Sequence, residues 1–141
     1  GAFMLKNLRL LLLICMTAVL AACGGGDGGD STPNFAGNYL EKFNLTTNSC
    51  NLNLQTTFTG TDAVTQDARN ISIVRGGIAF VGTVDADNGG FTVNGTITSS
   101  GVSVLGTINY RTITAGSAYS LDYKLIGNGC TTVYTGTATK I

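Results

Sequence analysis

Apolar and polar residues alternate along most of the chain after residue 34. In the stretch FTVNGTI, residues 91–97, every second residue is apolar or glycine, and the residues between them are Thr or Asn. The stretches at 102–110 and 117–125 repeat this period of two. Because successive side chains of a β-strand point to opposite faces, the pattern predicts strands with one apolar face each. We therefore expect an all-β domain.

Turn residues divide this region into eight predicted strands. Gly-rich and Asn-rich connections supply the positive φ angles that short hairpin loops need, and they fall at 76–77, 88–89, 99–101 and 127–129. The order of strands and tight turns predicts a meander. The predicted strands span residues 36–46, 50–59, 69–75, 78–85, 90–98, 102–111, 117–126 and 130–139.

The segment 60–70, GTDAVTQDARN, is predicted to be the longest connection between strands. It carries Asp62, Asp67 and Arg69 around Ala63 and Val64. Two interpretations are open: an ordinary solvated loop, or a functional lid over the mouth of a barrel.

Eight short antiparallel strands leave two open edges unless the sheet closes, so we expect an eight-stranded antiparallel up-and-down β-barrel. Cys50 and Cys130 provide a test of closure. In a closed barrel their strands are separated by one strand, about 9 to 10 Å, whereas in an open sheet they are about 29 Å apart. Only in the closed barrel can the loops at that end bring the two cysteines within bonding range, so we expect a disulfide to form; two free buried thiols are the alternative.

The alternation also suits a transmembrane barrel, whose apolar face meets lipid. Such barrels carry aromatic girdles near both strand ends, whereas Phe80, Tyr119, Tyr123 and Tyr134 lie further inside the predicted strands. We therefore expect the apolar face to point inward and the Thr-rich face outward.

The N-terminal region has the organisation of a signal peptide. Met4 is a plausible start, which makes residues 1–3 a scar or a misassigned start, and Lys6 and Arg9 form a positive n-region. Residues 10–22 are then free of charge. Thirteen helical residues fall well short of a bilayer core of roughly 30 Å, so this run indicates an h-region and not a membrane span.

The end of that run, Leu20-Ala21-Ala22-Cys23, resembles the lipobox of bacterial lipoproteins. The resemblance implies cleavage between Ala22 and Cys23 and attachment of lipid, including palmitate, at Cys23. Gly24, where an aspartate would imply retention in the inner membrane, implies sorting to the outer membrane of the cell envelope. A secretory signal with a chance cysteine is the alternative.

Three segments follow from these features. Residues 1–22 comprise the scar and the signal peptide that is removed, and residues 23–33 comprise the lipidated Cys23 and a flexible Gly/Asp linker. Ten Gly-rich linker residues span roughly 17 Å on average, which would keep the domain near the membrane. Residues 34–141 form the β-barrel domain.

Composition excludes several functions. From Cys23 onward six basic residues stand against eight acidic ones, so no basic surface for nucleic acid is expected. The chain has no histidine, which removes the commonest general base and a common metal ligand. We expect no enzyme activity and no cofactor.

The turn VDADNGG, residues 84–90, resembles the opening of a calcium loop. Asp85, Asp87 and Gly90 match its first, third and sixth positions, but Gly89 and Thr96 stand where further oxygen ligands are needed. We therefore expect a hairpin and no metal site.

The body resembles, in architecture, the lipocalins and related calycin barrels, which bind small apolar molecules inside. Recurring Gly-Thr pairs place glycines on the apolar face of several strands. These glycines either let a small barrel bend, or leave room for a ligand. On the second interpretation the candidate ligand-binding residues are Phe80, Gly82, Phe91, Gly95, Gly106, Tyr110, Tyr119 and Tyr123.

Two functions are therefore expected from the sequence. The first is a membrane-tethered lipoprotein that binds a small apolar ligand. The second is a structural or protein-interaction lipoprotein with a filled barrel, acting on an envelope protein as an assembly factor or an enzyme inhibitor.

Overall fold

The computed structural model describes residues 31–99 and 101–141. The predicted signal peptide, Cys23 and residues 24–30 of the linker lie outside the described residues. The described chain contains no helix, and so none that is long and apolar enough to cross a membrane. Residues from Thr32 to Ile141 belong to one compact unit.

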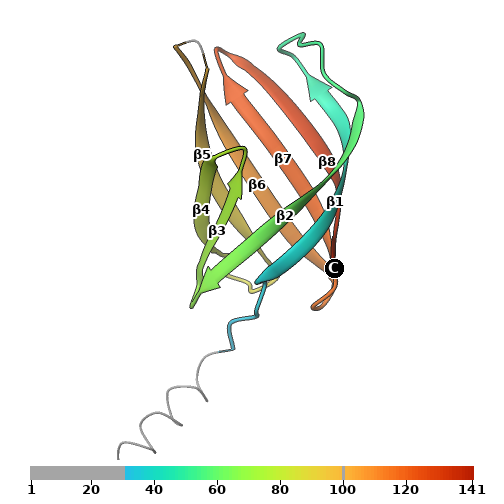
Figure 1. The fold of residues 1–141 in the computed structure, drawn as a ribbon, viewed down its shortest axis with the longest axis vertical. Helices are drawn as coiled ribbons and strands as arrows, with labels where there is room; N and C mark the ends of the chain where they lie inside the picture. The colour runs from blue at the N-terminus through green and yellow to red at the C-terminus, as the bar shows by residue number, and fades with distance from the viewer. Residues whose placement is uncertain (1–30, 100) are drawn as a thin grey trace, which may run out of the picture. The chain divides into compact units, whose positions relative to one another are not determined.

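Eight antiparallel strands pair in sequence order, and β8 pairs with β1 to close a barrel (Figure 1). The expected up-and-down barrel is confirmed. The strands are β1 (Gly37–Asn48), β2 (Thr57–Asp67), β3 (Asn70–Arg75), β4 (Ile78–Val84), β5 (Gly90–Ser99), β6 (Val102–Thr114), β7 (Ala118–Gly127) and β8 (Cys130–Lys140).

The alternating pattern separates a buried inner face from an exposed outer face. In β7, Tyr119, Leu121 and Tyr123 are buried, whereas Ser120 and Asp122 between them are exposed. The same alternation in β1 buries every second residue from 39 to 43. The apolar face therefore points into the barrel, as expected.

Two-residue turns set the register of the tight hairpins. Gly76 and Gly77 connect β3 to β4 with φ angles of 58° and 77°. Asn128 and Gly129 connect β7 to β8 with φ angles of 51° and 73°. Positive φ at both positions matches the right-handed twist of the flanking strands, which is why Gly and Asn occupy these turns.

The expected position of the second strand was wrong. Residues 60–67 form most of β2 and are neither a loop nor a lid, whereas residues 49–56 form the connection from β1. Within β2, Asp62 and Val64 are buried on the inner face and Ala63 is exposed between them. The inward position of Asp62 interrupts the apolar face of the strand, so the alternation is not visible in the sequence. A buried charge needs a partner, and the local sequence does not show which residue that partner is.

Cys50 and Cys130 form the expected disulfide, with a Cα–Cα distance of 5.0 Å. Cys50 does not begin a strand: it follows β1 in the connection that runs beside β8. The Ser49 amide donates to the Thr131 carbonyl at 3.0 Å, and the Thr131 amide donates to Ser49 Oγ at 2.7 Å. These bonds bring the two cysteines closer than a one-strand separation would.

Aromatic side chains fill the end of the barrel where β1 begins. The Phe35 ring lies 5.4 Å from that of Phe91 and 5.8 Å from that of Tyr119. The Tyr39 ring lies 5.4 Å from that of Tyr110, and its hydroxyl donates to the Phe35 carbonyl at 2.7 Å. Aromatic rings therefore fill the barrel interior at this end, which we call the closed end.

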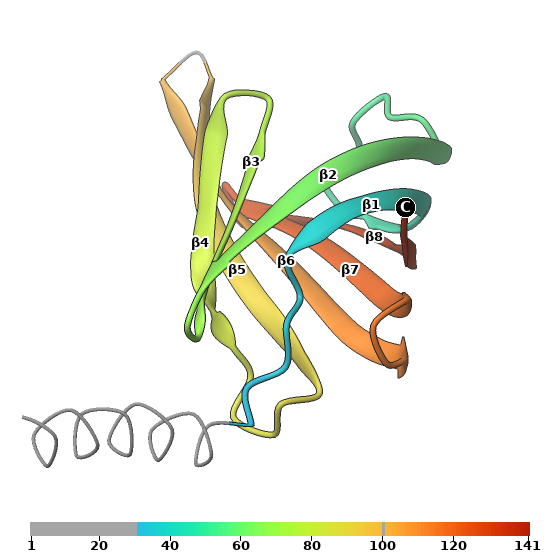
Figure 2. The same cartoon turned by 60° about the horizontal axis from the view of Figure 1, so that its bottom comes forward.

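Backbone pairing is incomplete at the opposite end, the disulfide end. The β2–β3 pairing stops at Val64 and Ile73, and the β4–β5 pairing stops at Val81 and Asn94. Residues 57–63 of β2 and 95–99 of β5 consequently pair on one side only, and we call these two edges the pairing gap. Figure 1 shows β2 and β5 diverging above the short β3–β4 hairpin, and Figure 2 shows β2 running away from that hairpin.

Candidate functional site

The disulfide end of the barrel contains a cavity of about 440 Å³, here called the mouth cavity. This volume lies within the range of pockets that hold small molecules. Inward side chains from three strands form its apolar wall, and the disulfide and Leu52 form part of its rim. The lining residues are Cys50, Leu52, Ile97, Val102, Val104, Leu125, Gly127, Asn128, Cys130 and Thr132.

Phe80 fills the barrel beneath this region. A Cβ added at Gly95 would lie 2.9 Å from Phe80 Cδ1, and one added at Gly106 would lie 2.7 Å from Phe80 Cε1. The same Gly106 position is 3.5 Å from Cδ2 of Leu125, which lines the mouth cavity. The two glycines therefore make room for an aromatic ring of the protein itself.

Thr132 is the buried polar residue in the mouth cavity. It is 1% exposed, and its Oγ1 has no hydrogen-bond partner among the described residues. It lies on the inner face of β8, two residues before buried Tyr134. Sequence analysis did not select Thr132, although its alternation with Tyr134 marks it as inward.

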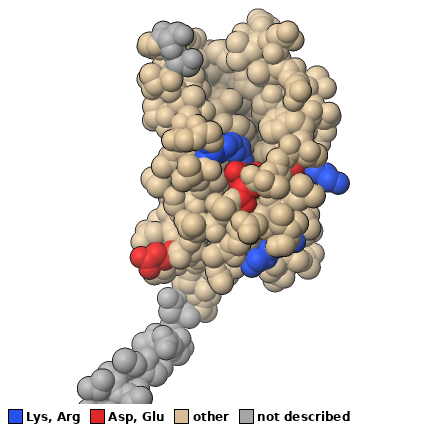
Figure 3. Space-filling model, viewed as in Figure 1, with Lys and Arg blue, Asp and Glu red and all other residues tan. Residues whose placement is uncertain are grey.

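A cluster of charged side chains lies inside the barrel wall beside the pairing gap. Arg75 Nη2 is 3.0 Å from Glu41 Oε1, and Arg75 Nε donates to Asp62 Oδ2 at 3.1 Å. The Tyr110 hydroxyl donates to Glu41 Oε2 at 2.5 Å. We call Glu41, Asp62 and Arg75 the charged cluster. Figure 3 shows basic and acidic side chains next to each other in the middle of one face.

Burial changes the protonation of this cluster. Glu41 is 1% exposed, and its desolvation, together with a hydrogen bond to Asp62, raises its pKa to about 8. Arg75 and Tyr110 act in the opposite direction but do not cancel the effect. Burial, and then the charge of Glu41, also raise the pKa of Tyr110. Burial therefore favours the protonated form of Glu41, whereas Arg75 favours its charged form.

Two aromatic rings hold the Arg75 guanidinium. Its Cζ lies 4.6 Å from the centre of the Tyr123 ring and 5.3 Å from that of Phe43. These cation–π contacts stabilise a charge that is partly withdrawn from water. Arg75 Nη1 is buried and has no hydrogen-bond partner among the described residues. Sequence analysis did not select the charged cluster, although Glu41 stands at an inward position between Tyr39 and Phe43.

The residues predicted to bind a ligand are placed elsewhere. Most belong to the packed interior: Phe80, Phe91, Tyr110, Tyr119 and Tyr123 are buried, and Gly95 and Gly106 contact Phe80. None of the eight lines the mouth cavity. Their role in binding stays a prediction from the sequence.

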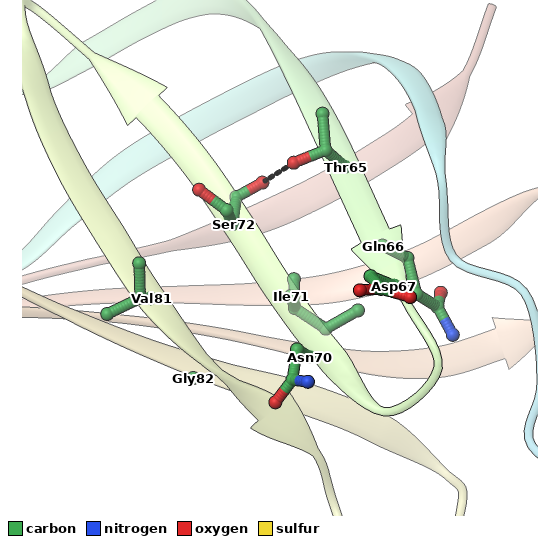
Figure 4. Close-up of a pocket in the computed structure, with 8 residues that line it drawn as sticks. All are labelled: Thr65, Gln66, Asp67, Asn70, Ile71, Ser72, Val81 and Gly82. Carbon is green, nitrogen blue, oxygen red and sulfur yellow. Dashed lines mark hydrogen bonds between the residues drawn. The ribbon is translucent and has the colours of Figure 1, made fainter.

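Gly82, the eighth predicted residue, lines a different and shallower depression of about 480 Å³ across β2, β3 and β4 (Figure 4). Five of its eight lining residues are polar, although the surface that they enclose is mostly apolar. The Thr65 hydroxyl donates to the Ser72 carbonyl at 3.2 Å. A Cβ at Gly82 would lie 1.9 Å from the Thr92 carbonyl oxygen. Gly82 therefore permits close approach of β4 and β5, which supports the interpretation that glycines bend this barrel.

The turn that resembles a calcium loop forms a hairpin between β4 and β5. The Asp85 amide donates to the Gly90 carbonyl at 2.9 Å. Arg111 Nη1 is 3.0 Å from Asp85 Oδ2, and its Nη2 is 2.7 Å from Asp87 Oδ2. Within residues 31–99 and 101–141 no group of His, Cys, Asp and Glu is arranged to hold a metal ion. Both carboxylates instead neutralise an arginine.

Comparison of the chain with protein-family models, with curated proteins and with solved structures gives no match. The resemblances of residues 20–23 to a lipobox and of the body to lipocalins therefore stay predictions from the sequence. Function is inferred from the residues and their geometry.

Proposed function

We propose that this protein is a lipid-anchored lipoprotein of the bacterial cell envelope whose barrel binds a small apolar molecule at its disulfide end. The mouth cavity is the observation that carries the proposal. It offers Ile97, Val104 and Leu125 as an apolar wall, whereas the closed end is filled by aromatic rings. A ligand there buries apolar surface without displacing the packed core.

The proposed role is binding and not catalysis. The chain has no histidine, and the buried side chains of Glu41 and Asp62 are bound to Arg75. Neither of these two residues lines the mouth cavity. A ligand in the cavity therefore meets no acid or base among the residues that line it.

Substitution of adjacent residues on opposite faces of β6 tests the site. Val104 lines the mouth cavity, whereas its neighbour Leu105 is exposed on the outer face. In the mature chain carrying Cys23→Ser, we expect Val104→Trp to abolish binding of an uncharged apolar fluorophore such as N-phenylnaphthylamine, and Leu105→Trp to preserve it. Equal binding by both variants would exclude the mouth cavity as the site.

The proposed anchor depends on Cys23, which is tested in the full-length protein. Cys23→Ser should prevent labelling with palmitate and should release the protein from the outer-membrane fraction. Cys15→Ser, within the predicted signal peptide, is the matched control and should leave both unchanged. Palmitate labelling of the Cys23→Ser protein would show that the lipobox interpretation is wrong.

A protein-interaction role is the second candidate, and the pairing gap favours it. Asp62 is the one charged residue within 57–63 and 95–99, and these two ranges contain no Pro, so few of the features that usually protect an open strand edge are present. An extended segment of an envelope protein could pair with such an edge. A photo-crosslinking residue at Thr59, in the gap, should then capture a partner that the same residue at Thr65, opposite Ser72, does not.

A further inference from the structure

We infer that the ligand of the mouth cavity is an uncharged amphiphile, a mostly apolar molecule with one hydroxyl or carbonyl oxygen, and that Thr132 binds this oxygen. The inference rests on the proposed function and specifies the ligand. It is carried by the unpaired hydroxyl of Thr132 and by the absence of charge around it.

The position of Thr132 places its side chain between two neighbouring elements. It is opposite Leu125 of β7 on one side and Asn48 of β1 on the other, and it lines the cavity together with Leu125. Its backbone is paired with β1 on one side and β7 on the other, so the position of its Cβ is fixed. A different staggered rotamer about the Cα–Cβ bond places the hydroxyl where the methyl group now lies, which allows the hydroxyl to face a ligand.

A buried hydroxyl without a partner is unfavourable, because folding removes it from water and supplies nothing in exchange. Most buried side-chain polar atoms in proteins have a partner, so an exception indicates a missing one. Thr132 Oγ1 is such an exception, and it belongs to a residue that lines the cavity. A hydroxyl can donate or accept, so either a hydroxyl or a carbonyl oxygen of a ligand would satisfy it.

Amphiphiles with ionised head groups do not fit the cavity interior, because no charged side chain lines it. The lining residues include no Asp, Glu, Lys or Arg. A carboxylate or ammonium group would lose its hydration there without gaining an opposite charge, which is strongly unfavourable. Arg75 does not line the cavity and is already paired with Asp62 and Glu41. An uncharged ligand is therefore favoured over a fatty acid.

Three probes with chains of the same length test the inference: n-octanol, n-octane and octanoate. Their affinities are measured by displacement of N-phenylnaphthylamine from the mature chain carrying Cys23→Ser. We expect n-octanol to bind more tightly than octanoate. Thr132→Val, which replaces the hydroxyl by a methyl group, should weaken n-octanol by about threefold to tenfold and leave n-octane unchanged.

Thr132→Ser keeps the hydroxyl and should retain most of the preference for n-octanol. Thr137→Val, at an exposed position of the same strand, controls for the loss of a threonine and should change nothing. Circular dichroism checks that each variant folds.

The outcomes separate the inference from the proposed function. If n-octanol binds equally well to the parent chain and to Thr132→Val, or if octanoate binds as tightly as n-octanol, the inference is wrong and the mouth cavity remains the ligand site. If neither the dye nor any probe binds to the parent chain, both are wrong.

Discussion

Arg75 and Asp62 face each other across β2 and β3 at the inward position that follows the last backbone pair of these strands. The backbone pairing between β2 and β3 ends at Val64 and Ile73. Two residues further along each strand, the side chains of Asp62 and Arg75 connect the two strands instead. Arg75 also reaches Glu41 on β1. The ion pair therefore joins three strands beside the pairing gap, where backbone hydrogen bonds no longer do so.

Loss of Arg75 should destabilise the barrel strongly. Arg75→Met keeps an unbranched apolar stem but leaves the buried carboxylate of Asp62 without its cation. Breaking a buried ion pair from one side typically costs about 3 to 5 kcal/mol. Urea denaturation at neutral pH should show a loss of this size in the free energy of unfolding.

Arg111→Met is the control for this prediction. Arg111 also binds two carboxylates, but its side chain is 42% exposed and that of Asp87 is 61% exposed, so solvent replaces the lost partner. We expect a much smaller destabilisation. Similar losses in both variants would show that the charged cluster does not hold the barrel wall.

Glu41 should make the barrel less stable as the pH rises from about 5 to about 8. Burial raises its folded pKa to about 8, above the ordinary value of 4.5. Between these values the folded chain holds a proton that the unfolded chain has released, so the free energy of unfolding decreases with pH. The slope contributed by one such group is at most about 1.4 kcal/mol per pH unit.

Glu41→Gln removes this titration, so its stability should depend less on pH within the same window. Asp87→Asn is the matched control. The guanidinium of Arg111 holds the pKa of Asp87 well below its usual range, so its contribution changes only at more acidic pH. A parent chain whose unfolding free energy is constant from pH 5 to pH 8 would contradict the assignment to Glu41.

The sequence predicts strands best where the alternation is uninterrupted. β5, β6 and β7 place apolar residues or glycine at almost every inward position, and their bounds agree closely with the expected ranges. β2 was misplaced because Asp62 occupies an inward position. Its partner Arg75 lies on another strand, and a local pattern contains no information about which distant residue neutralises a charge.

The candidate site was less predictable than the fold, for a related reason. On one of the two interpretations, the glycines at 95 and 106 leave room for a ligand on the inner face, but Phe80 from β4 lies against both of them. Which ring fills which space depends on how far each strand is shifted along the barrel. The mouth cavity lies between Phe80 and the disulfide end of the barrel. It is lined by residues such as Thr132 that no sequence motif distinguishes.

Replacement of Ala68 by glycine should stabilise the protein. Ala68 occupies the β2–β3 turn with a φ of 52°, a conformation that costs an L-residue roughly 1 to 2 kcal/mol and glycine almost nothing. The side chain is exposed, so no packing is lost. After the greater flexibility of unfolded glycine is subtracted, we expect a gain of about 0.5 to 1 kcal/mol in the free energy of unfolding.

Ala63→Gly is the control for this gain. Ala63 is also exposed, but it lies within β2, where it is paired with Asn38 and its φ is not positive. Glycine there should destabilise the protein by up to about 1 kcal/mol. A loss of stability in both variants would show that the turn does not strain Ala68.

Removal of the disulfide should affect both stability and binding. The bond joins residues 80 positions apart, and for a loop of that length the chain-entropy model gives about 4 to 5 kcal/mol as an upper value. Cys50 and Cys130 also line the mouth cavity, as does Leu52 in the connection that the bond fastens to β8. The double variant Cys50→Ala/Cys130→Ala should therefore unfold at lower urea concentration and bind N-phenylnaphthylamine more weakly.

The parent chain treated with dithiothreitol separates two causes of weaker binding, the loss of the covalent constraint and the loss of the sulfur atoms. Reduction retains both sulfur atoms as thiols, so it removes the constraint without deleting atoms from the cavity rim. If weaker binding results from release of residues 49–56, the reduced parent chain and the double variant should lose affinity equally. If only the double variant loses affinity, the sulfur atoms contact the ligand directly. Unchanged binding in both would place the ligand away from the disulfide end, against the proposed site.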